Sequence, residues 1–180
     1  MIIWIDGTYG VGKTAVAKRL KEKFPDGNIE LLESDYYSNE VLKRLVEEAK
    51  ANNSFPKIGG TLPQNNIDFI KEFREMIEGK IQKENKNVIV DMALTRKECK
   101  EELFDYLKSK GANIAHIILT ADEDIIRERI RNDGSRIKEI ALDWLAQNMV
   151  FLDNNFPDAI RIKTDNRSIN DVVAEIADVI

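Results

Sequence analysis

The chain has 180 residues, of which 43% are hydrophobic and 33% are charged. This length suits one compact domain, and the composition supplies both a hydrophobic core and a solvated surface. Acidic side chains outnumber basic ones by 32 to 27, and the resulting net charge of -5 argues against general affinity for nucleic acid or for an anionic membrane. The single cysteine, Cys99, excludes an intramolecular disulfide and any cysteine-rich metal site.

The sequence carries no sign of export or of membrane insertion. No apolar run is long enough to span a bilayer, and the opening residues, MIIWIDG, lack the basic region of a signal peptide. A single thiol fits a reducing compartment. We therefore expect a soluble, cytoplasmic protein in which residues 1–180 form one domain, while its oligomeric state stays open.

In the N-terminal half, short apolar runs alternate with helical patterns. In chain order, the predicted elements are strand Ile2–Ile5, helix Thr14–Lys23, strand Ile29–Glu33 and helix Tyr37–Ala51. The apolar stripe of the last helix consists of Val41, Leu42, Leu45, Val46 and Ala49. Residues 52–64 contain two prolines and a Gly-Gly pair, which predicts a mobile loop.

The C-terminal half continues the same alternation. Its predicted elements are a helix from Ile67 to about Glu84, strand Val88–Asp91, helix Lys97–Lys110, strand Ile114–Leu119, helix Asp122–Arg131, helix Ile137–Leu152, strand Ala159–Ile162 and helix Asn170–Val179. Continuous apolar strands that alternate with helices are typical of a parallel sheet covered on both faces. The predicted fold class is therefore α/β, a doubly wound domain with about five parallel strands.

Residues 7–14, GTYGVGKT, match the pattern G-x-x-x-x-G-K-[ST]. The glycines allow successive backbone N–H groups to point at phosphate oxygens, Lys13 brings positive charge to the β- and γ-phosphates, and Thr14 can bind Mg²⁺ through its hydroxyl. The motif follows an apolar strand and opens a helix, whose positive end faces the same anion. It predicts binding of ATP with Mg²⁺, through contacts from Gly7, Tyr9, Gly10, Val11, Gly12, Lys13, Thr14 and Ala15.

Two longer segments, MIIWIDGTYGVGKT and TDNRSINDVVAEIA, resemble the tunicamycin resistance proteins, a branch of the P-loop kinase-like ATPases. VIVDM, IILTADEDIIRERIR and FLDNNF lie between them in the order that this family has, so the resemblance covers essentially the whole chain. Shikimate kinase, chloramphenicol phosphotransferase and the nucleoside monophosphate kinases are the broader relatives that the chain resembles. The resemblance implies the strand order 2-3-1-4-5 and a short lid at about residues 132–136.

Three carboxylates stand where predicted strands end. Asp91 closes an apolar strand, as a Walker B carboxylate does, and would emerge at the carboxyl edge of the sheet beside the P-loop; the alternative is a turn residue. Glu33 and Asp35, two apart in an extended segment, would lie on one side. They resemble the Asp-x-Asp pair of shikimate kinase, which would make Glu33 a metal ligand and Asp35 a base for the acceptor. The alternative is that Asp35 or Ser34 caps the next helix. Asp6, next to the P-loop, is a weaker candidate for a functional carboxylate.

Arginines gather around the predicted lid. By resemblance to shikimate-kinase-like enzymes, Arg129 would pack on adenine and Arg136 would reach the transferring phosphoryl group, with Arg131 as the alternate for either. A planar guanidinium suits both tasks because it stacks and also donates bidentately. The segment Thr164–Asn166 resembles the loop that passes the adenine edge, so Asn166 is expected at the nucleotide; the alternative is an N-cap cluster.

Other residues have simpler interpretations. The only histidine, His116, lies within an apolar strand and is expected to be a core residue with a satisfied side chain. Trp144, Leu145, Met149 and Leu152 are expected to form a core stripe, on a helix that can also border the acceptor pocket. Arg96 and the loop from Phe55 to Pro63 lie on the side where an acceptor would enter.

These observations predict an enzyme that transfers the γ-phosphate of ATP to a hydroxyl of a small molecule. A nucleoside-like antibiotic such as tunicamycin, a sugar or a nucleotide are the candidate acceptors. One alternative is a protein that sequesters such an antibiotic in a nucleotide-dependent way without turnover. A regulatory NTPase is a third reading, which the absence of a GTPase-type base motif disfavours.

Overall fold

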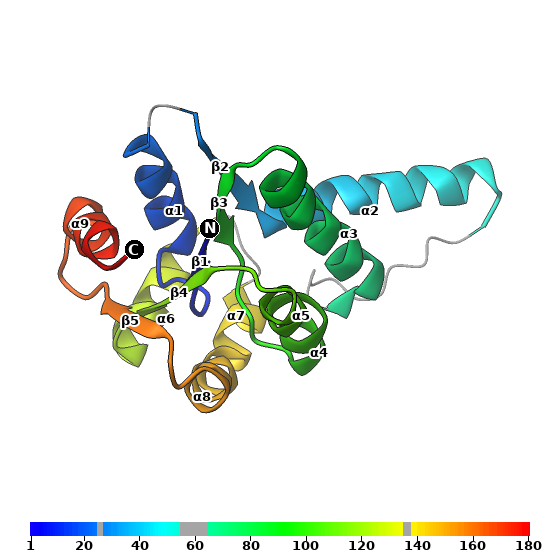
Figure 1. Ribbon diagram of the computed structural model, residues 1–180. Helices are drawn as coiled ribbons and strands as arrows, with labels where there is room; N and C mark the ends of the chain where they lie inside the picture. The colour runs from blue at the N-terminus through cyan, green and yellow to red at the C-terminus, as the bar shows by residue number, and fades with distance from the viewer. Residues whose placement is uncertain (25–26, 55–64, 135–137) are drawn as a thin grey trace.

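The computed structural model describes residues 1–24, 27–54, 65–134 and 138–180. At its centre is a five-stranded sheet in the order β2-β3-β1-β4-β5, and every neighbouring pair of strands is parallel (Figure 1). The strands are β1 (Ile2–Asp6), β2 (Ile29–Glu33), β3 (Asn87–Asp91), β4 (Ile114–Thr120) and β5 (Ile160–Lys163). The predicted fold class and the strand order implied by the family resemblance are both confirmed.

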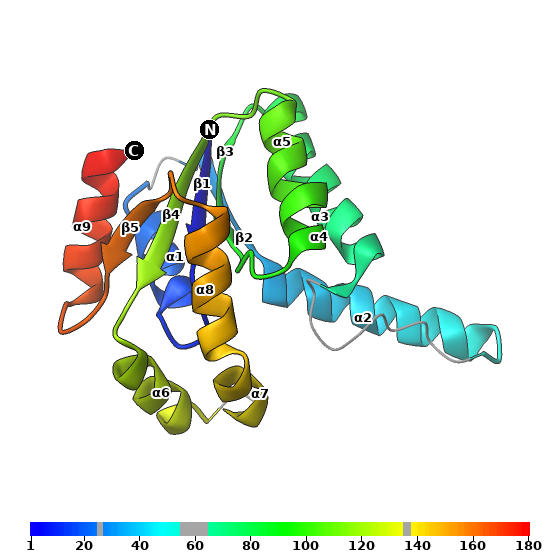
Figure 2. The same cartoon turned by 90° about the horizontal axis from the view of Figure 1, so that it is seen from below.

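Helices cover both faces of this sheet. They are α1 (Lys13–Glu22), α2 (Ser34–Ala51), α3 (Ile67–Glu78), α4 (Lys97–Cys99), α5 (Tyr106–Ser109), α6 (Glu123–Asn132), α7 (Lys138–Asp143), α8 (Leu145–Asn155) and α9 (Ile169–Val179), with π-helical segments η2 (Gly79–Lys83) and η3 (Lys100–Asp105). Figure 2 shows α1 and α9 on one side of the sheet, and α8 with α3, α4 and α5 on the other. In the described parts of the chain, none of the helices combines the length and the apolar character needed to cross a membrane.

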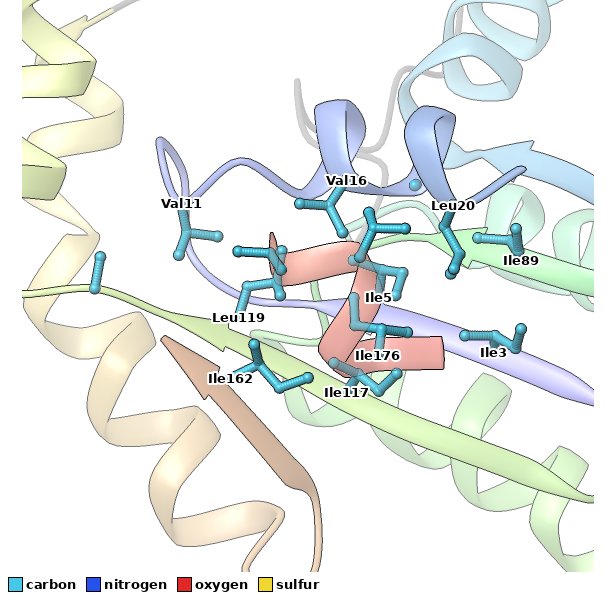
Figure 3. Close-up of a cluster of buried hydrophobic side chains, with 14 of the residues drawn as sticks. Ile3, Ile5, Val11, Val16, Leu20, Ile89, Ile117, Leu119, Ile162 and Ile176 are labelled. Atoms are coloured by element: carbon cyan, nitrogen blue, oxygen red, sulfur yellow. The ribbon is translucent and has the colours of Figure 1, made fainter. Parts of the chain in front are cut away.

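The core consists of two clusters separated by the sheet. Successive side chains of a strand point to opposite faces, so Ile3 and Ile5 of β1 join a cluster with α1 and α9 (Figure 3). Ile2 and Trp4 join the other cluster, which contains apolar residues of α3, η3 and α5. All four side chains are fully buried, and burial of each stabilises the fold by about 1.5–3 kcal/mol. The central strand is therefore held from both sides.

The start of α2 corrects the prediction for the Glu33 and Asp35 pair. The strand ends at Glu33 and the helix begins at Ser34, three residues before the predicted start. Asp35 therefore lies in the first helical turn, not in an extended segment, so the argument that placed both carboxylates on one side is wrong. The cap alternative is also wrong, because the N-cap position is Glu33 and it makes no side-chain capping bond.

The apolar stripe predicted for α2 is mostly not core. Only Ala49 of the stripe is buried, and Leu42 is 39% exposed. Figures 1 and 2 show α2 extending away from the sheet beyond α3. Ile67, the first residue of the next predicted helix, is 43% exposed. Periodicity identifies the apolar face of a helix, but the tertiary arrangement decides how much of that face finds a partner.

The segment after the predicted lid is divided into two helices. The expected helix Ile137–Leu152 is interrupted at Trp144, between α7 and α8. Leu145 and Leu152 are buried, but Trp144 is 37% exposed and is not part of the core, contrary to the prediction. Arg136, part of the predicted lid and most of the predicted 52–64 loop lie outside the described residues.

Candidate active site

The loop between β1 and α1 has a backbone that only glycine can adopt at its first position. Gly7 has a φ of +138°, and a Cβ atom there would lie 2.7 Å from the backbone oxygen of Leu119 in β4. Gly10 has a φ of +73°, and its Cβ would lie 2.9 Å from Cγ1 of Ile130 in α6. Side chains at these positions would be strained and would also collide with their neighbours. The glycines thus let the loop pack closely against β4 and α6.

This loop borders a pocket of about 210 Å³. The pocket is lined by Gly10, Gly12, Lys13, Thr14, Ala15, Arg129 and Asp133. The helix α1 begins at Lys13, and its N-cap residue, Gly12, provides no side-chain capping bond. The first N–H groups of a helix, when no side chain caps them, form a binding site for an anion.

The remaining loop residues predicted to contact nucleotide have different positions. Val11 is 1% exposed, and its side chain lies in the core cluster shown in Figure 3, so only its backbone is available to a ligand. Tyr9 is half-buried and packs against the same cluster. The backbone oxygen of Thr8 accepts a hydrogen bond from Lys13 Nζ at 2.9 Å, which folds the lysine back over the loop.

The end of β3 brings a carboxylate to the start of α1. Thr14 Oγ1 donates a hydrogen bond to Asp91 Oδ2 at 2.6 Å. Burial raises the pKa of Asp91, and the charges of Asp35 and Glu33 raise it further, whereas Lys13 and the bond from Thr14 lower it. The predicted metal ligands Thr14 and Asp91 are thus in contact, and the other two carboxylates are close enough to act on Asp91 electrostatically.

The oxygen ligands at this point fit Mg²⁺. Hydroxyl and carboxylate oxygens are the ligands that this ion prefers, and it usually keeps water and phosphate oxygens as well. Among the described residues, no three His, Cys, Asp or Glu side chains are grouped so that they could hold a metal ion. Thr14 and Asp91 therefore suit an ion bound together with phosphates. Glu33 instead pairs with Lys18, at 3.0 Å between Oε2 and Nζ.

Among the predicted arginines that the structure describes, Arg129 is the one brought to the pocket. Its Nη1 donates to Thr164 Oγ1 at 2.9 Å and its Nη2 donates to the Thr164 backbone oxygen at 3.1 Å. Arg131 and Asn166 are exposed and do not line this pocket. The N-cap alternative for residues 164–166 is wrong, because Ser168 caps α9.

A buried carboxylate that sequence analysis ranked last organises this edge of the sheet. Asp6 is fully buried, and its Oδ1 accepts hydrogen bonds from the N–H groups of Gly7 at 2.6 Å and Leu94 at 3.0 Å. Its Oδ2 lies 2.9 Å from Nε2 of His116, which accounts for the only histidine of the chain. An acidic residue at the end of an apolar strand needs buried partners, and this signal could have identified Asp6.

A second pair missed from the sequence lies near the same edge. The guanidinium carbon of Arg96 lies 4.1 Å from the ring centroid of Trp144. Trp144 was expected in a core stripe and Arg96 on the acceptor side, and nothing in the spacing of the two residues indicates that they meet.

The fold and this site define a P-loop protein of the kinase-like type, which implies nucleotide binding. A family model described as an AAA domain, AAA_33, matches residues 2–151. The chain therefore belongs to this family. A comparison with curated protein sequences finds no match.

Solved structures share the fold over nearly the whole chain. The tunicamycin resistance protein of Deinococcus radiodurans is 23% identical with a TM-score of 0.75, and the match covers 99% of this chain and 94% of that one. Shikimate kinase from Bacteroides thetaiotaomicron is 16% identical with a TM-score of 0.63, covering 99% and 97%. The APS kinase CysC of Mycobacterium tuberculosis is 14% identical with a TM-score of 0.59, covering 99% and 95%. These likenesses confirm the predicted resemblance at the level of the fold.

Proposed function

We propose that this protein is an ATP-dependent phosphotransferase that acts on a hydroxyl of a small molecule. The observation that carries the proposal is the 2.6 Å contact between Thr14 and Asp91 beside Lys13, at the P-loop pocket. Each of these groups has a task in phosphoryl transfer, which depends mainly on positioning and on stabilisation of phosphate charge. The kinase-like fold supports the same class of reaction.

The nucleotide is held by the loop and by the residues around it. In this proposal the amides of residues 7–15 surround the phosphates, and Lys13 donates to the β- and γ-phosphate oxygens. Arg129 packs on adenine, and Arg131 and Asn166 are the further candidates on that side. Thr14 and Asp91 would hold Mg²⁺, with Glu33 as a third candidate ligand; the ion, when bound, neutralises charge on the phosphates.

The transfer step needs a group for the proton of the acceptor. The hydroxyl oxygen forms a bond to the γ-phosphorus as the bond from that phosphorus to the bridging oxygen of ADP breaks. Asp35 takes the proton of the hydroxyl, from its place in the first turn of α2. Arg136, outside the described residues, is proposed to reach the phosphoryl group. In this proposal the predicted lid closes over the phosphates, which would exclude water and favour phosphoryl transfer over hydrolysis of ATP.

The acceptor is proposed from a short set of candidates. The fold shared with the tunicamycin resistance protein of Deinococcus radiodurans supports a nucleoside-like antibiotic, and the fold shared with shikimate kinase supports a smaller hydroxyl compound. A sugar or a nucleotide completes the set.

A second function is favoured by one observation. Asp35 is exposed and lies in α2, not in an extended segment with Glu33, so the extended carboxylate pair that the sequence predicted for an acceptor is not formed. A protein that binds the antibiotic together with a nucleotide, and releases the antibiotic unchanged, would need no catalytic base for an acceptor hydroxyl.

The experiment that separates the two functions is a screen for ATP consumption. Mg²⁺ and ATP are supplied with tunicamycin, other antibiotics, sugars, nucleosides and nucleotides, using the unmodified protein, Asp35→Asn and the control Glu47→Gln, an exposed residue of the same helix. For the kinase we expect acceptor-dependent ADP release that falls about 10²- to 10⁴-fold in Asp35→Asn and stays unchanged in the control. Binding of tunicamycin without ATP consumption, equal in all three proteins, would replace the kinase with sequestration.

A further inference from the structure

The two tryptophans of the chain have opposite environments. Trp4 is fully buried in the core, whereas Trp144 is 37% exposed, at the junction of α7 and α8. The guanidinium of Arg96 lies over the ring of Trp144, with its central carbon 4.1 Å from the ring centroid. A stacked guanidinium keeps its N–H groups free at its edge, in a plane suited to bidentate binding.

The backbone segment that leads to Arg96 is tied to the start of the P-loop. It follows β3, whose last residue is Asp91. The N–H of Leu94, two residues before Arg96, donates to Asp6 Oδ1, which also accepts from the first amide of the P-loop. The same carboxylate thus positions both the P-loop and the segment that carries Arg96. This places the Arg96–Trp144 pair at the carboxyl edge of the sheet, where ligands of parallel α/β folds bind.

Among the described residues, Arg96 has no acidic partner of the kind that a structural arginine usually has. Within the described part of the chain it forms no ion pair, and its one hydrogen bond, from Nη1 to the Thr95 backbone oxygen, is long at 3.4 Å. Arg74 provides the contrast. It stacks at 4.0 Å on Tyr106, donates to the Glu102 backbone oxygen at 2.8 Å and has the Glu102 carboxylate at 3.8 Å.

We propose that Arg96 and Trp144 form an oxyanion-binding subsite for the acceptor, so that the acceptor carries a carboxylate or a phosphate besides its reacting hydroxyl. Trp144 fixes the plane of the guanidinium, and the guanidinium binds the oxyanion through paired N–H···O bonds. The three carboxylates at the site, Glu33, Asp35 and Asp91, repel an anionic acceptor, and Arg96 offsets that repulsion. The inference rests on the proposed phosphotransferase function and narrows its substrate class.

The first part of the test compares related acceptors with and without an oxyanion. Glucose, gluconate and glucose 6-phosphate form one set, and uridine and uridine 5′-phosphate form another, each supplied with Mg²⁺ and ATP. We expect kcat/KM at least about tenfold higher for an anionic member than for its neutral partner. The comparison of gluconate with glucose 6-phosphate decides whether the oxyanion is a carboxylate or a phosphate.

Variants then assign this preference to the proposed residues. Arg96→Gln is expected to raise KM for the anionic acceptor about tenfold and to abolish the discrimination between charged and neutral members, while Arg96→Lys retains part of it because the charge remains. Arg74→Gln is the matched control and is expected to leave the discrimination intact. A merely structural Arg96 would lower kcat or stability for all acceptors alike and would leave their ratio unchanged, and that result overturns the subsite.

Fluorescence tests the subsite without requiring turnover. Trp144 is the exposed tryptophan, so its emission is quenched by acrylamide, and the quenchable part is identified by its loss in Trp144→Phe. We expect the anionic members to protect it and the neutral members not to. Protection without any ATP consumption would retain the subsite and reject the phosphotransferase. Phosphorylation that prefers neutral acceptors would reject the subsite and leave the phosphotransferase in place. The absence of protection by any member of either set would also reject the subsite.

Discussion

The two halves of the candidate active site are built differently. On the P-loop side, the glycines pack against β4 and α6, and the helix that follows buries Val16, Ala17 and Leu20 in the core. On the α2 side, an 18-residue helix buries only Ser34 and Ala49, and it exposes 61% of Tyr36. Phosphates need a preformed arrangement of amides, whereas the side proposed to receive the acceptor is held by fewer buried contacts.

A hollow between α2 and α3 accompanies this looser side. It has a volume of about 340 Å³. Its lining residues are Tyr37, Glu40, Val41, Arg44, Phe69, Glu72, Phe73 and Met76. The ring of Phe73 lies 5.4 Å from that of Phe69 within α3, and 5.8 Å from that of Tyr37, a contact that ties the start of α2 to α3. The difference between the halves predicts that shortening a side chain on the P-loop side lowers the unfolding free energy more than a comparable change on α2.

Among the variants on the P-loop side, the largest effect on activity is expected for Lys13→Ala. Removal of this ammonium group takes away the positive charge proposed to stabilise the β- and γ-phosphates, and we expect acceptor-dependent ATP consumption to fall by about 10²- to 10³-fold. Lys23→Ala, at the exposed end of α1, is the control and should retain full activity. Retained activity in Lys13→Ala would exclude the P-loop as the transfer site.

A large loss of stability is expected for Asp6→Ala. This change leaves the amides of Gly7 and Leu94 and the ring of His116 without their buried acceptor, which should cost about 3–5 kcal/mol of unfolding free energy. Asp6→Asn should cost much less, because its amide oxygen still accepts and the histidine can change tautomer. Urea denaturation measures both values, and equal losses would contradict this account of the carboxylate.

A matched pair of leucine variants tests the comparison of the two halves directly. Leu20→Ala removes a fully buried side chain of α1 and should cost about 2–5 kcal/mol. Leu42→Ala removes a side chain of α2 that is 39% exposed, and it should cost less than about 1 kcal/mol. Both values come from equilibrium unfolding, and similar values would show that α2 is as firmly packed as α1.

The smallest effect, and one of opposite sign, is expected for the stability of Asp91→Asn without ligands. Folding raises the pKa of Asp91 mainly through burial, so its stabilising contribution is complete below the pKa of the unfolded group and is lost as the pH rises through the folded value. At pH 7 the variant should therefore have a higher Tm than the unmodified protein, and the difference should shrink as the pH falls toward about 4. Mg²⁺-dependent activity should be lost in the same variant, and a lower Tm at pH 7 would contradict the assigned cost of burial.

The elements that the sequence predicted correctly are those marked by neighbouring residues in the chain. All five strands were located to within one residue at each end, because each is a short apolar run closed by polar residues or by glycine. Prediction failed at Ser34–Asp35, where a strand passes directly into a helix without a capping side chain to mark the boundary. It also failed at Trp144, where an apolar pattern continues across a break between two helices.

The sequence by itself determined the fold class and the P-loop, because strand periodicity and the GTYGVGKT spacing are properties of neighbouring residues. The tertiary structure alone decided that Asp6 meets His116, 110 residues away, and that Arg96 meets Trp144. Such contacts depend on which strands become neighbours in the sheet and on where each connecting segment leaves its edge. Local patterns carry no information about those distances, so partners far apart in the chain become visible only when the sheet order β2-β3-β1-β4-β5 brings them together.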